Sequence, residues 1–166
     1  MLLAFCSCGG TDSNTNGNEE SLVPSMAEGP YEVVRVVDGD TFIAKIDGSD
    51  VRVRVLCIDT PESVTPDYVG KKNTKEGSVA SDRTKELLGG GKVYLEYDEE
   101  KYDQYDRVLA YVYLEDGRRL EDILISEGLC KVVYFEPNGK YQDELNALQA
   151  EAKKNKVGFW GTTWKK

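Results

Sequence analysis

Two aspartates lie where predicted strands end, and together they could bind a hard metal ion. Asp40 follows an Asp-Gly pair at 38–39, which is a hairpin signal, and Asp59 closes a strand predicted over 51–58. In a three-strand meander, the first turn and the far end of the third strand lie at the same end of the sheet. The two carboxylates can therefore converge and supply oxygen ligands to Ca²⁺ or Mg²⁺. A plain hairpin turn is the alternative reading of the Asp-Gly-Asp segment.

The Asp-Thr-Pro-Glu segment at 59–62 adds a candidate general base. Pro61 keeps the chain extended as it leaves the strand and thereby fixes where Glu62 points. A glutamate three residues beyond a metal-binding aspartate can accept a proton from a metal-bound water. The alternative is a solvated loop carboxylate.

Two arginines could bind a phosphate near these carboxylates. Arg54 lies five residues before Asp59, and Arg107 begins a later strand. The planar guanidinium group bonds two phosphate oxygens at once and keeps its charge. Taken singly, an arginine of this kind is more often a surface or ion-paired residue. Strand alternation leaves Arg54 either facing solvent or pointing into a polar opening.

Composition narrows the possible chemistry. The 166 residues include no histidine, which excludes Ser-His-Asp and Cys-His nucleophile systems and His-ligated zinc. The four cysteines are too scattered for a four-cysteine metal site, and Cys57 and Cys130 are expected to be buried free thiols. The net charge of −9 argues against a non-specific nucleic-acid binder, although residues 1–28 hold four acidic and no basic side chains.

The N-terminal region is predicted to be a tail outside the folded domain. Residues 1–8 resemble the end of a bacterial lipoprotein signal, with Cys8 as the acylated residue and Cys6 as the weaker candidate. Residues 9–29 are polar, without apolar periodicity, and predict a flexible linker. We therefore expect an exported protein, either a cell-envelope lipoprotein attached to a membrane by lipid or a secreted protein. An arbitrary N-terminus with two incidental thiols is the alternative.

The rest of the chain, 30–164, predicts one mainly β domain of the α+β class. Expected strands cover 31–37, 41–46, 51–58, 92–97 and 107–114; expected helices cover 75–88, 120–127 and 141–155, with an extended piece at 129–135. Short, hairpin-linked strands favour a five-stranded OB-fold Greek-key barrel with about three helices. An open α+β sheet is the alternative.

The ordered set of motifs resembles the staphylococcal nuclease (thermonuclease) family. The segments are Val-Asp-Gly-Asp-Thr at 37–41, Arg-Val-Leu-Cys-Ile-Asp-Thr-Pro-Glu at 54–62, Asp-Gln-Tyr-Asp-Arg at 103–107 and Gly-Phe-Trp at 158–160. This resemblance implies an OB-fold barrel and calcium-dependent phosphodiester hydrolysis of DNA and RNA that leaves 3′-phosphate ends. We expect a monomer.

The resemblance also implies roles for individual residues. Asp40 and Asp59 match the carboxylate ligands of Ca²⁺, and Thr60 matches the position that contributes a backbone carbonyl. Tyr105 and Tyr134 resemble the tyrosines that contact the bound nucleotide.

The catalytic positions match as well. Arg54 and Arg107 match the two phosphate-binding arginines, and Glu62 matches the proposed general base.

Two departures bear on nucleotide affinity. Asp106 stands where a glycine commonly precedes the arginine, and Gln104 stands where a lysine often occurs. A carboxylate beside Arg107 could pair with it or repel the phosphate. The competing functions are a non-catalytic OB-fold module that binds nucleic acid and an acidic, calcium-binding surface lipoprotein.

Overall fold

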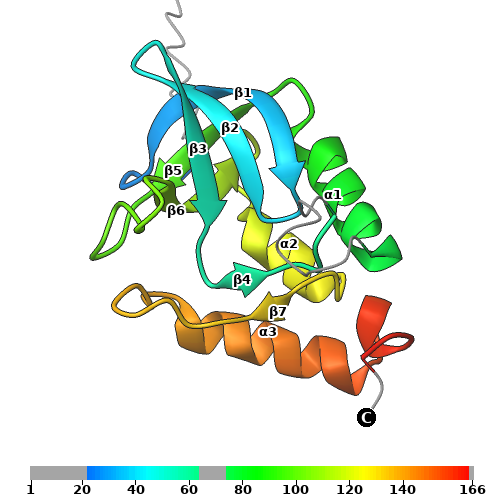
Figure 1. Cartoon of the computed structure of the whole chain (residues 1–166). Coiled ribbons are helices and arrows are strands. Elements are labelled where there is room, and N and C mark those ends of the chain that lie inside the picture. Colours follow the sequence, from blue (N-terminus) through cyan, green and yellow to red (C-terminus); the bar gives the residue numbers. More distant parts are fainter. Residues whose placement is uncertain (1–21, 64–73, 165–166) are drawn as a thin grey trace, which may run out of the picture.

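A computed structural model describes residues 22–63 and 74–164. Five strands close into a barrel in the order β1-β2-β3-β6-β5 (Figure 1). Neighbouring strands are antiparallel except β3 and β6, which run parallel. Their bounds are Glu28–Asp38 (β1), Thr41–Ile46 (β2), Ser49–Val55 (β3), Lys92–Glu96 (β5) and Val108–Leu114 (β6). The predicted OB-type barrel is confirmed.

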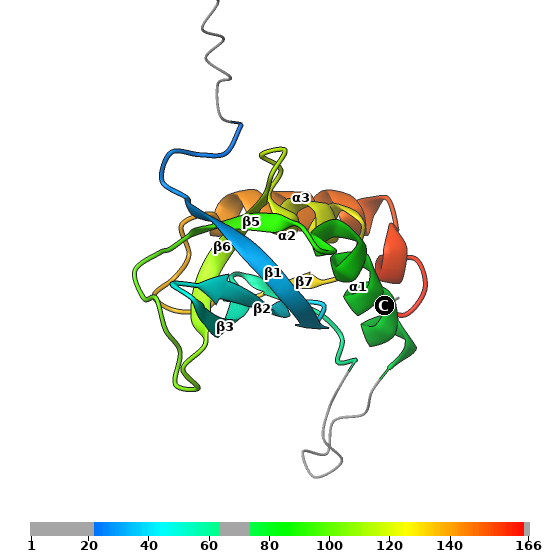
Figure 2. The same ribbon diagram turned by 90° about the horizontal axis from the view of Figure 1, so that it is seen from above.

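Three helices and a two-stranded ladder lie outside the barrel. The ladder joins β4 (Ile58–Asp59) to β7 (Lys131–Val132). The helices are α1 (Lys75–Leu88), α2 (Leu120–Ser126) and α3 (Gln142–Lys154), followed by a 3₁₀ turn, η2 (Gly158–Trp160). The ladder runs between the barrel and α3 in Figure 1, and α1 lies beside the barrel in both views (Figures 1 and 2). No helix in the described residues is long and apolar enough to cross a membrane.

The strands fold this way because apolar side chains alternate along them. Phe42 of β2 pairs with Val53 of β3, which pairs with Val108 of β6, and all three are buried. These three side chains point into the barrel, so the residues next to them in each strand point outward. The alternation therefore turns Arg52 and Arg54 to the outer face of β3.

The strand predicted over 51–58 is broken in two. β3 ends at Val55, and β4 begins at Ile58 after a turn in which Cys57 takes a left-handed backbone conformation, with φ of 59°. The turn sends Asp59 away from the barrel wall and into the ladder with β7. Cys57 and Cys130 are free and buried, as predicted.

The folded part also begins earlier than expected. β1 starts at Glu28, which pairs with Leu95 of β5, and Val23 is buried against the core. Within the stretch 22–29, apolar Val23 and Ala27 pack against the core, while Leu22 and Met26 are exposed. Cys6 and Cys8, and the rest of the predicted signal and linker up to residue 21, lie outside the described residues.

A fully buried carboxyl group makes the stability of the fold depend on pH. The Glu121 side chain on α2 is fully buried and accepts hydrogen bonds from the Val112 amide of β6, at 3.3 and 3.4 Å. Burial raises the pKa of Glu121 to about 8, against the opposing effects of its hydrogen bonds and of the Arg119 charge.

We expect Glu121→Gln to stabilise the protein at alkaline pH. Between about pH 4.5 and pH 8 the folded state holds a proton on Glu121 that the unfolded state has lost. The free energy of unfolding therefore falls as pH rises through this window, by at most about 1.4 kcal/mol per pH unit. Glutamine cannot titrate, so the variant should match the wild type near pH 4.5 and exceed it by a few kcal/mol at pH 8.

Urea unfolding at pH 5, 6, 7 and 8 measures this difference. Glu115→Gln, at an exposed glutamate, is the matched control. A stability difference between Glu121→Gln and wild type that stays constant from pH 5 to pH 8 would contradict the assignment.

Candidate functional site

The carboxylate of Asp40, just after the β1–β2 turn, is the centre of the site. Asp40 as a whole is only 7% exposed. One oxygen accepts a hydrogen bond from the Thr41 hydroxyl at 3.0 Å. The other accepts from the Thr60 amide at 2.9 Å and from the Thr60 hydroxyl at 3.1 Å. Asp40 therefore fixes the segment that follows β4 against the start of β2.

Arg54 brings the two predicted metal-binding carboxylates together. Its Nη2 lies 3.3 Å from an oxygen of Asp40 and 3.5 Å from an oxygen of Asp59. The Arg54 side chain is 7% exposed, whereas that of Asp59 is 56% exposed. The two carboxylates thus converge on one point, with Asp59 on the solvent side.

Further contacts on its other sides hold the Arg54 guanidinium in place. Its Nη1 donates a hydrogen bond to the Val55 carbonyl at 2.7 Å. The ring of Phe135, in the β7–α3 loop, lies 5.1 Å from its central carbon. The sequence left open whether Arg54 faces solvent or points into a polar opening, and the structure shows that it points into the polar opening.

The β1–β2 turn needs a glycine because the site is packed onto it. A Cβ on Gly39 would lie 2.8 Å from side-chain atoms of Thr60. The Gly39 carbonyl also accepts a hydrogen bond from the Thr84 hydroxyl of α1 at 2.7 Å, and the Asp40 carbonyl accepts one from the Val55 amide at 2.9 Å. The turn is therefore fixed by α1, β3 and Thr60 at once.

Asp38 connects the same turn to the segment that carries Glu62. Its carboxylate accepts hydrogen bonds from the Ser63 hydroxyl at 2.7 Å, the Ser63 amide at 3.3 Å and the Gly39 amide at 2.8 Å. Burial raises the pKa of Asp38 above its usual value, and these hydrogen bonds oppose the rise.

Thr74 and Gly77, which the sequence did not single out, hold Glu62 against α1. The Glu62 carbonyl accepts a hydrogen bond from the Thr74 amide at 3.0 Å, and the Thr74 hydroxyl caps the helix at the Gly77 amide. Threonine just before a predicted helix was a signal for the cap. A glycine inside that helix was a signal for a close backbone approach. The side chain of Glu62 is half-exposed.

Arg107 is held by Asp103 and does not pair with Asp106. The Asp103 carboxylate accepts hydrogen bonds from the Arg107 amide at 3.0 Å and from Nε at 2.7 Å. Burial acts to raise the pKa of Asp103, but its hydrogen bonds with Arg107 and the Tyr105 amide outweigh this and lower it. Tyr105 is exposed, with its ring 5.5 Å from the Arg107 guanidinium.

Asp106 is exposed and has a φ of 58°. This left-handed conformation is the physical reason why glycine suits the position. The carboxylate that the sequence placed beside Arg107 is thus on a turn, while the ion pair is made by Asp103.

The predicted residues fall into one cluster with two flanking parts. Arg54 pairs in register with Leu109, two residues after Arg107, whose own ion pair is with Asp103. Tyr134 is exposed on the β7–α3 loop, next to Phe135, which covers Arg54.

Asn138 joins the two loops that carry the predicted nucleotide-binding tyrosines. Its buried side chain accepts a hydrogen bond from the Glu100 amide at 2.7 Å and donates one to the Glu100 carbonyl at 2.9 Å. Glu100 belongs to the β5–β6 loop of Tyr105, and Asn138 to the loop of Tyr134. No local sequence pattern indicated this long-range contact.

The donor set fits a hard cation better than a soft one. Asp40, Asp59 and the Thr60 carbonyl offer only oxygen, and no cluster of three acidic or cysteine side chains forms a metal site in the described residues. Burial raises the pKa of the nearby Cys130 thiol well above its usual value, which keeps it neutral and unsuited to metal binding.

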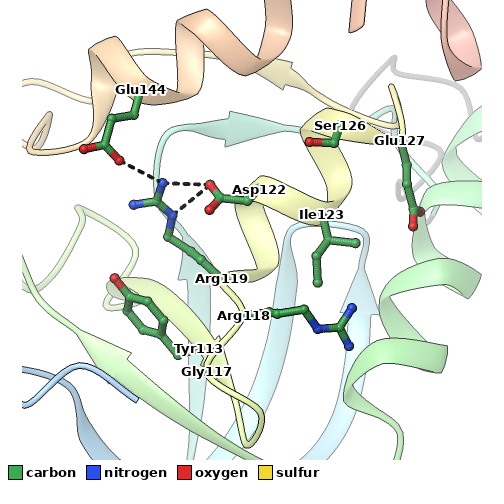
Figure 3. A pocket seen from close by; sticks show the side chains of 9 residues that line it. All are labelled: Tyr113, Gly117, Arg118, Arg119, Asp122, Ile123, Ser126, Glu127 and Glu144. Atoms are coloured by element: carbon green, nitrogen blue, oxygen red, sulfur yellow. Dashed lines mark hydrogen bonds and ion pairs between the residues drawn. The ribbon is translucent and has the colours of Figure 1, made fainter. Parts of the chain in front are cut away.

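A separate hollow of about 540 Å³ lies at the other end of β6 (Figure 3). Its charged groups are already paired: Arg119 contacts Asp122 and Glu144, as the dashed lines show. Arg118 pairs with Asp116, outside the drawn set. This hollow contains none of the predicted site residues, so we do not assign the chemistry to it.

We expect Gly77→Ala to separate Glu62 from α1. A Cβ at this position would lie 2.1 Å from the Glu62 carbonyl oxygen, so helix and loop must move apart. At an unhindered helix position the same change stabilises by about 1 kcal/mol; here we expect destabilisation of roughly 1–3 kcal/mol. Amide exchange of Thr74, which donates to that carbonyl, should become faster.

Hydrogen exchange by NMR and urea unfolding test both effects. Val79→Ala, at an exposed position of the same helix, is the control. Unaltered Thr74 exchange together with a gain in stability would show that the close approach is unimportant.

Comparison with known proteins identifies the family. Residues 52–162 match the family described as staphylococcal nuclease homologue. Thermonuclease from Staphylococcus hyicus is 42% identical over 147 residues, covering 88% of this chain and 79% of that protein. Thermonuclease from Staphylococcus intermedius is 42% identical over 130 residues, covering 78% and 75%. Endonuclease YncB from Bacillus subtilis (strain 168) is 41% identical over 159 residues, covering 89% and 74%. The chain therefore belongs to the staphylococcal nuclease family.

Proposed function

We propose that this protein is a calcium-dependent nuclease that hydrolyses phosphodiester bonds in DNA and RNA and leaves 3′-phosphate ends. The observation that carries the proposal is the convergence of Asp40 and Asp59 on the guanidinium of Arg54. A cation-binding pair of carboxylates beside a phosphate-binding arginine is what charge neutralisation at a phosphodiester requires. Family membership, with thermonucleases among the relatives, supports nuclease activity, and the motif resemblance implies the substrates and the product ends.

Asp40, Asp59 and the Thr60 carbonyl would hold the calcium ion. Ca²⁺ takes six to eight oxygen ligands, so these groups leave positions for water and for an oxygen of the substrate. When bound, the ion supplies Lewis-acid stabilisation of negative charge on the phosphate. Asp40 is kept in place by Thr41 and Thr60, and Asp59 is open to solvent on the substrate side.

Glu62 is the general base in this proposal. It follows Asp59 by three residues, and its backbone is fixed through Ser63 and Thr74. A glutamate carboxylate can accept the proton of an attacking water. The attachment of this segment to both Asp38 and α1 supports a fixed placement of the base relative to the carboxylates.

The two arginines stabilise the charge that develops on the phosphate. Arg54 is nearly buried, and a guanidinium held in a site of low water content acts more strongly than one in bulk water. Arg107 keeps its terminal nitrogens for the substrate while Asp103 binds its Nε. Asp103 is thus a positioning residue for Arg107.

Tyr105 and Tyr134 are the proposed contacts to the nucleotide. Their side chains are 69% and 57% exposed, on the two loops that Asn138 joins. Aromatic rings bind any base by stacking on its face, a contact that does not depend on the sugar. This supports action on both DNA and RNA.

The proposal predicts that activity requires a divalent cation and disappears with a chelator. Purified protein should degrade single- and double-stranded DNA and RNA in Ca²⁺, and addition of EDTA should stop degradation. End-group analysis should find 3′-phosphates. Tight binding of oligonucleotides with no cleavage in Ca²⁺ or Mg²⁺ would instead identify a non-catalytic binding module.

We further predict that Glu62→Gln and Arg107→Gln each reduce kcat by about 10²–10³-fold, the usual cost of losing one group that stabilises the transition state. Arg118→Gln and Glu115→Gln, which remove the same charges at exposed positions, are the controls. Steady-state kinetics on DNA in Ca²⁺, with thermal unfolding to confirm folding, provides the measurement. Wild-type turnover in either test variant would refute its role.

Export, acylation of Cys8 and a monomeric state remain predictions. The residues that carry the first two lie outside the described part of the chain. The polar composition of residues 9–21 supports a tether between a lipid anchor and the domain.

A further inference from the structure

We propose that Arg35 and Arg52 form a second phosphate-binding surface, which holds the polynucleotide chain beyond the bond that is cleaved. The inference rests on the proposed nuclease function and specifies its substrate: a strand of several nucleotides in preference to a dinucleotide. Together with Ile43, these two residues make up a row across the outer face of the barrel, here called the arginine row.

Strand register defines the arginine row. Arg35 of β1 pairs with Ile43 of β2, and Ile43 pairs with Arg52 of β3. Residues paired across neighbouring strands point to the same face. The next residue in β3, Val53, points into the barrel, so Arg52 points outward; Arg35 and Arg52 are both exposed.

The arginine row leads directly to the proposed catalytic arginines. Val53 pairs with Val108, the first residue of β6, so Arg52 and Arg107 each come immediately before a paired residue of the parallel β3–β6 ladder. Arg54 lies two residues further along β3 on the same face, about 7 Å away. The arginine row therefore adjoins the proposed site at Arg52, two residues before Arg54 in β3.

In the part of the chain that the structure describes, the two arginines of the row differ from the others in having no carboxylate partner. The chain has seven arginines. Five of them form ion pairs with aspartate or glutamate: Arg54, Arg83, Arg107, Arg118 and Arg119. Within residues 22–63 and 74–164, Arg35 and Arg52 form no such pair. Their full charge is available to a ligand, which is unusual in a protein with a net charge of −9.

A polynucleotide is the ligand that fits this arrangement. Arg35 and Arg52 are two strands apart, or roughly 10 Å, and neither converges on a single small anion. A chain with a negative charge on every nucleotide can contact both while its scissile phosphate lies at Arg54 and Arg107. Half-exposed Ile43 between them offers an apolar surface to the sugar or base.

The test compares a long and a short substrate in the Arg35→Gln/Arg52→Gln double variant. Loss of both exposed phosphate contacts should weaken binding of a 20-nucleotide DNA strand about tenfold. The ratio of kcat/KM for the 20-mer to that for a dinucleotide should fall by the same factor. The slope of log Kd against log salt should decrease by about 1.4.

Fluorescence anisotropy with labelled 20-mer in EDTA measures binding without cleavage. Arg118→Gln, at an exposed arginine beyond the other end of β6, is the matched control. A change in 20-mer affinity and salt slope no larger than that of Arg118→Gln would overturn the proposal. If the wild type cleaves neither substrate yet the double variant loses affinity and slope, the arginine row is confirmed as a binding surface and the nuclease function fails.

Discussion

The site depends on the burial of one carboxylate, that of Asp40. A carboxylate removed from water is costly unless hydrogen bonds and opposite charge compensate it. Here the compensation comes from Thr41, Thr60 and Arg54, which belong to β2, the segment after β4 and β3. Satisfying this one charge therefore brings three separate parts of the chain to the same place. The group proposed to bind the cation is also the group that assembles the site.

Ion pairing determines which arginines of this acidic protein have their charge available to a negatively charged substrate. Arg54 is oriented by Asp40 and Asp59, and Arg107 by Asp103, which limits their movement at the expense of part of their charge. Orientation is what transition-state stabilisation needs, since a fixed donor does not have to reorganise during the reaction. Arg35 and Arg52 have the opposite properties: they are exposed and carry full charge, which suits contact with a flexible strand.

Local patterns in the sequence predicted most of the fold. The Asp-Gly turns and alternating valines indicated the β1–β2–β3 meander, which in turn placed Asp40 and Asp59 at one end of the sheet. The helix at 75–88 was predicted with its observed bounds because apolar spacing and a glycine stop mark it. These features depend on residues close together in the chain.

Long-range contacts account for what the sequence could not show. Burial of Arg54 depends on Phe135, eighty-one residues away, and no spacing rule relates the two. The break between β3 and β4 depends on Cys57 adopting a positive φ, which is uncommon for a residue other than glycine. The partner of Arg107 is Asp103 because the turn at Asp106 points that carboxylate elsewhere, a matter of backbone direction.

The hydrogen bonds between Asn138 and Glu100 have a consequence for how base preference can change. The Asn138 side chain bonds one tyrosine loop to the main chain of the other at Glu100, so a displacement of one loop is transmitted to the other. Tyr105 and Tyr134 thus lie on two loops that are bonded to each other. The proposed nucleotide contacts would therefore have to be redesigned together, because lengthening either loop alone would displace the other.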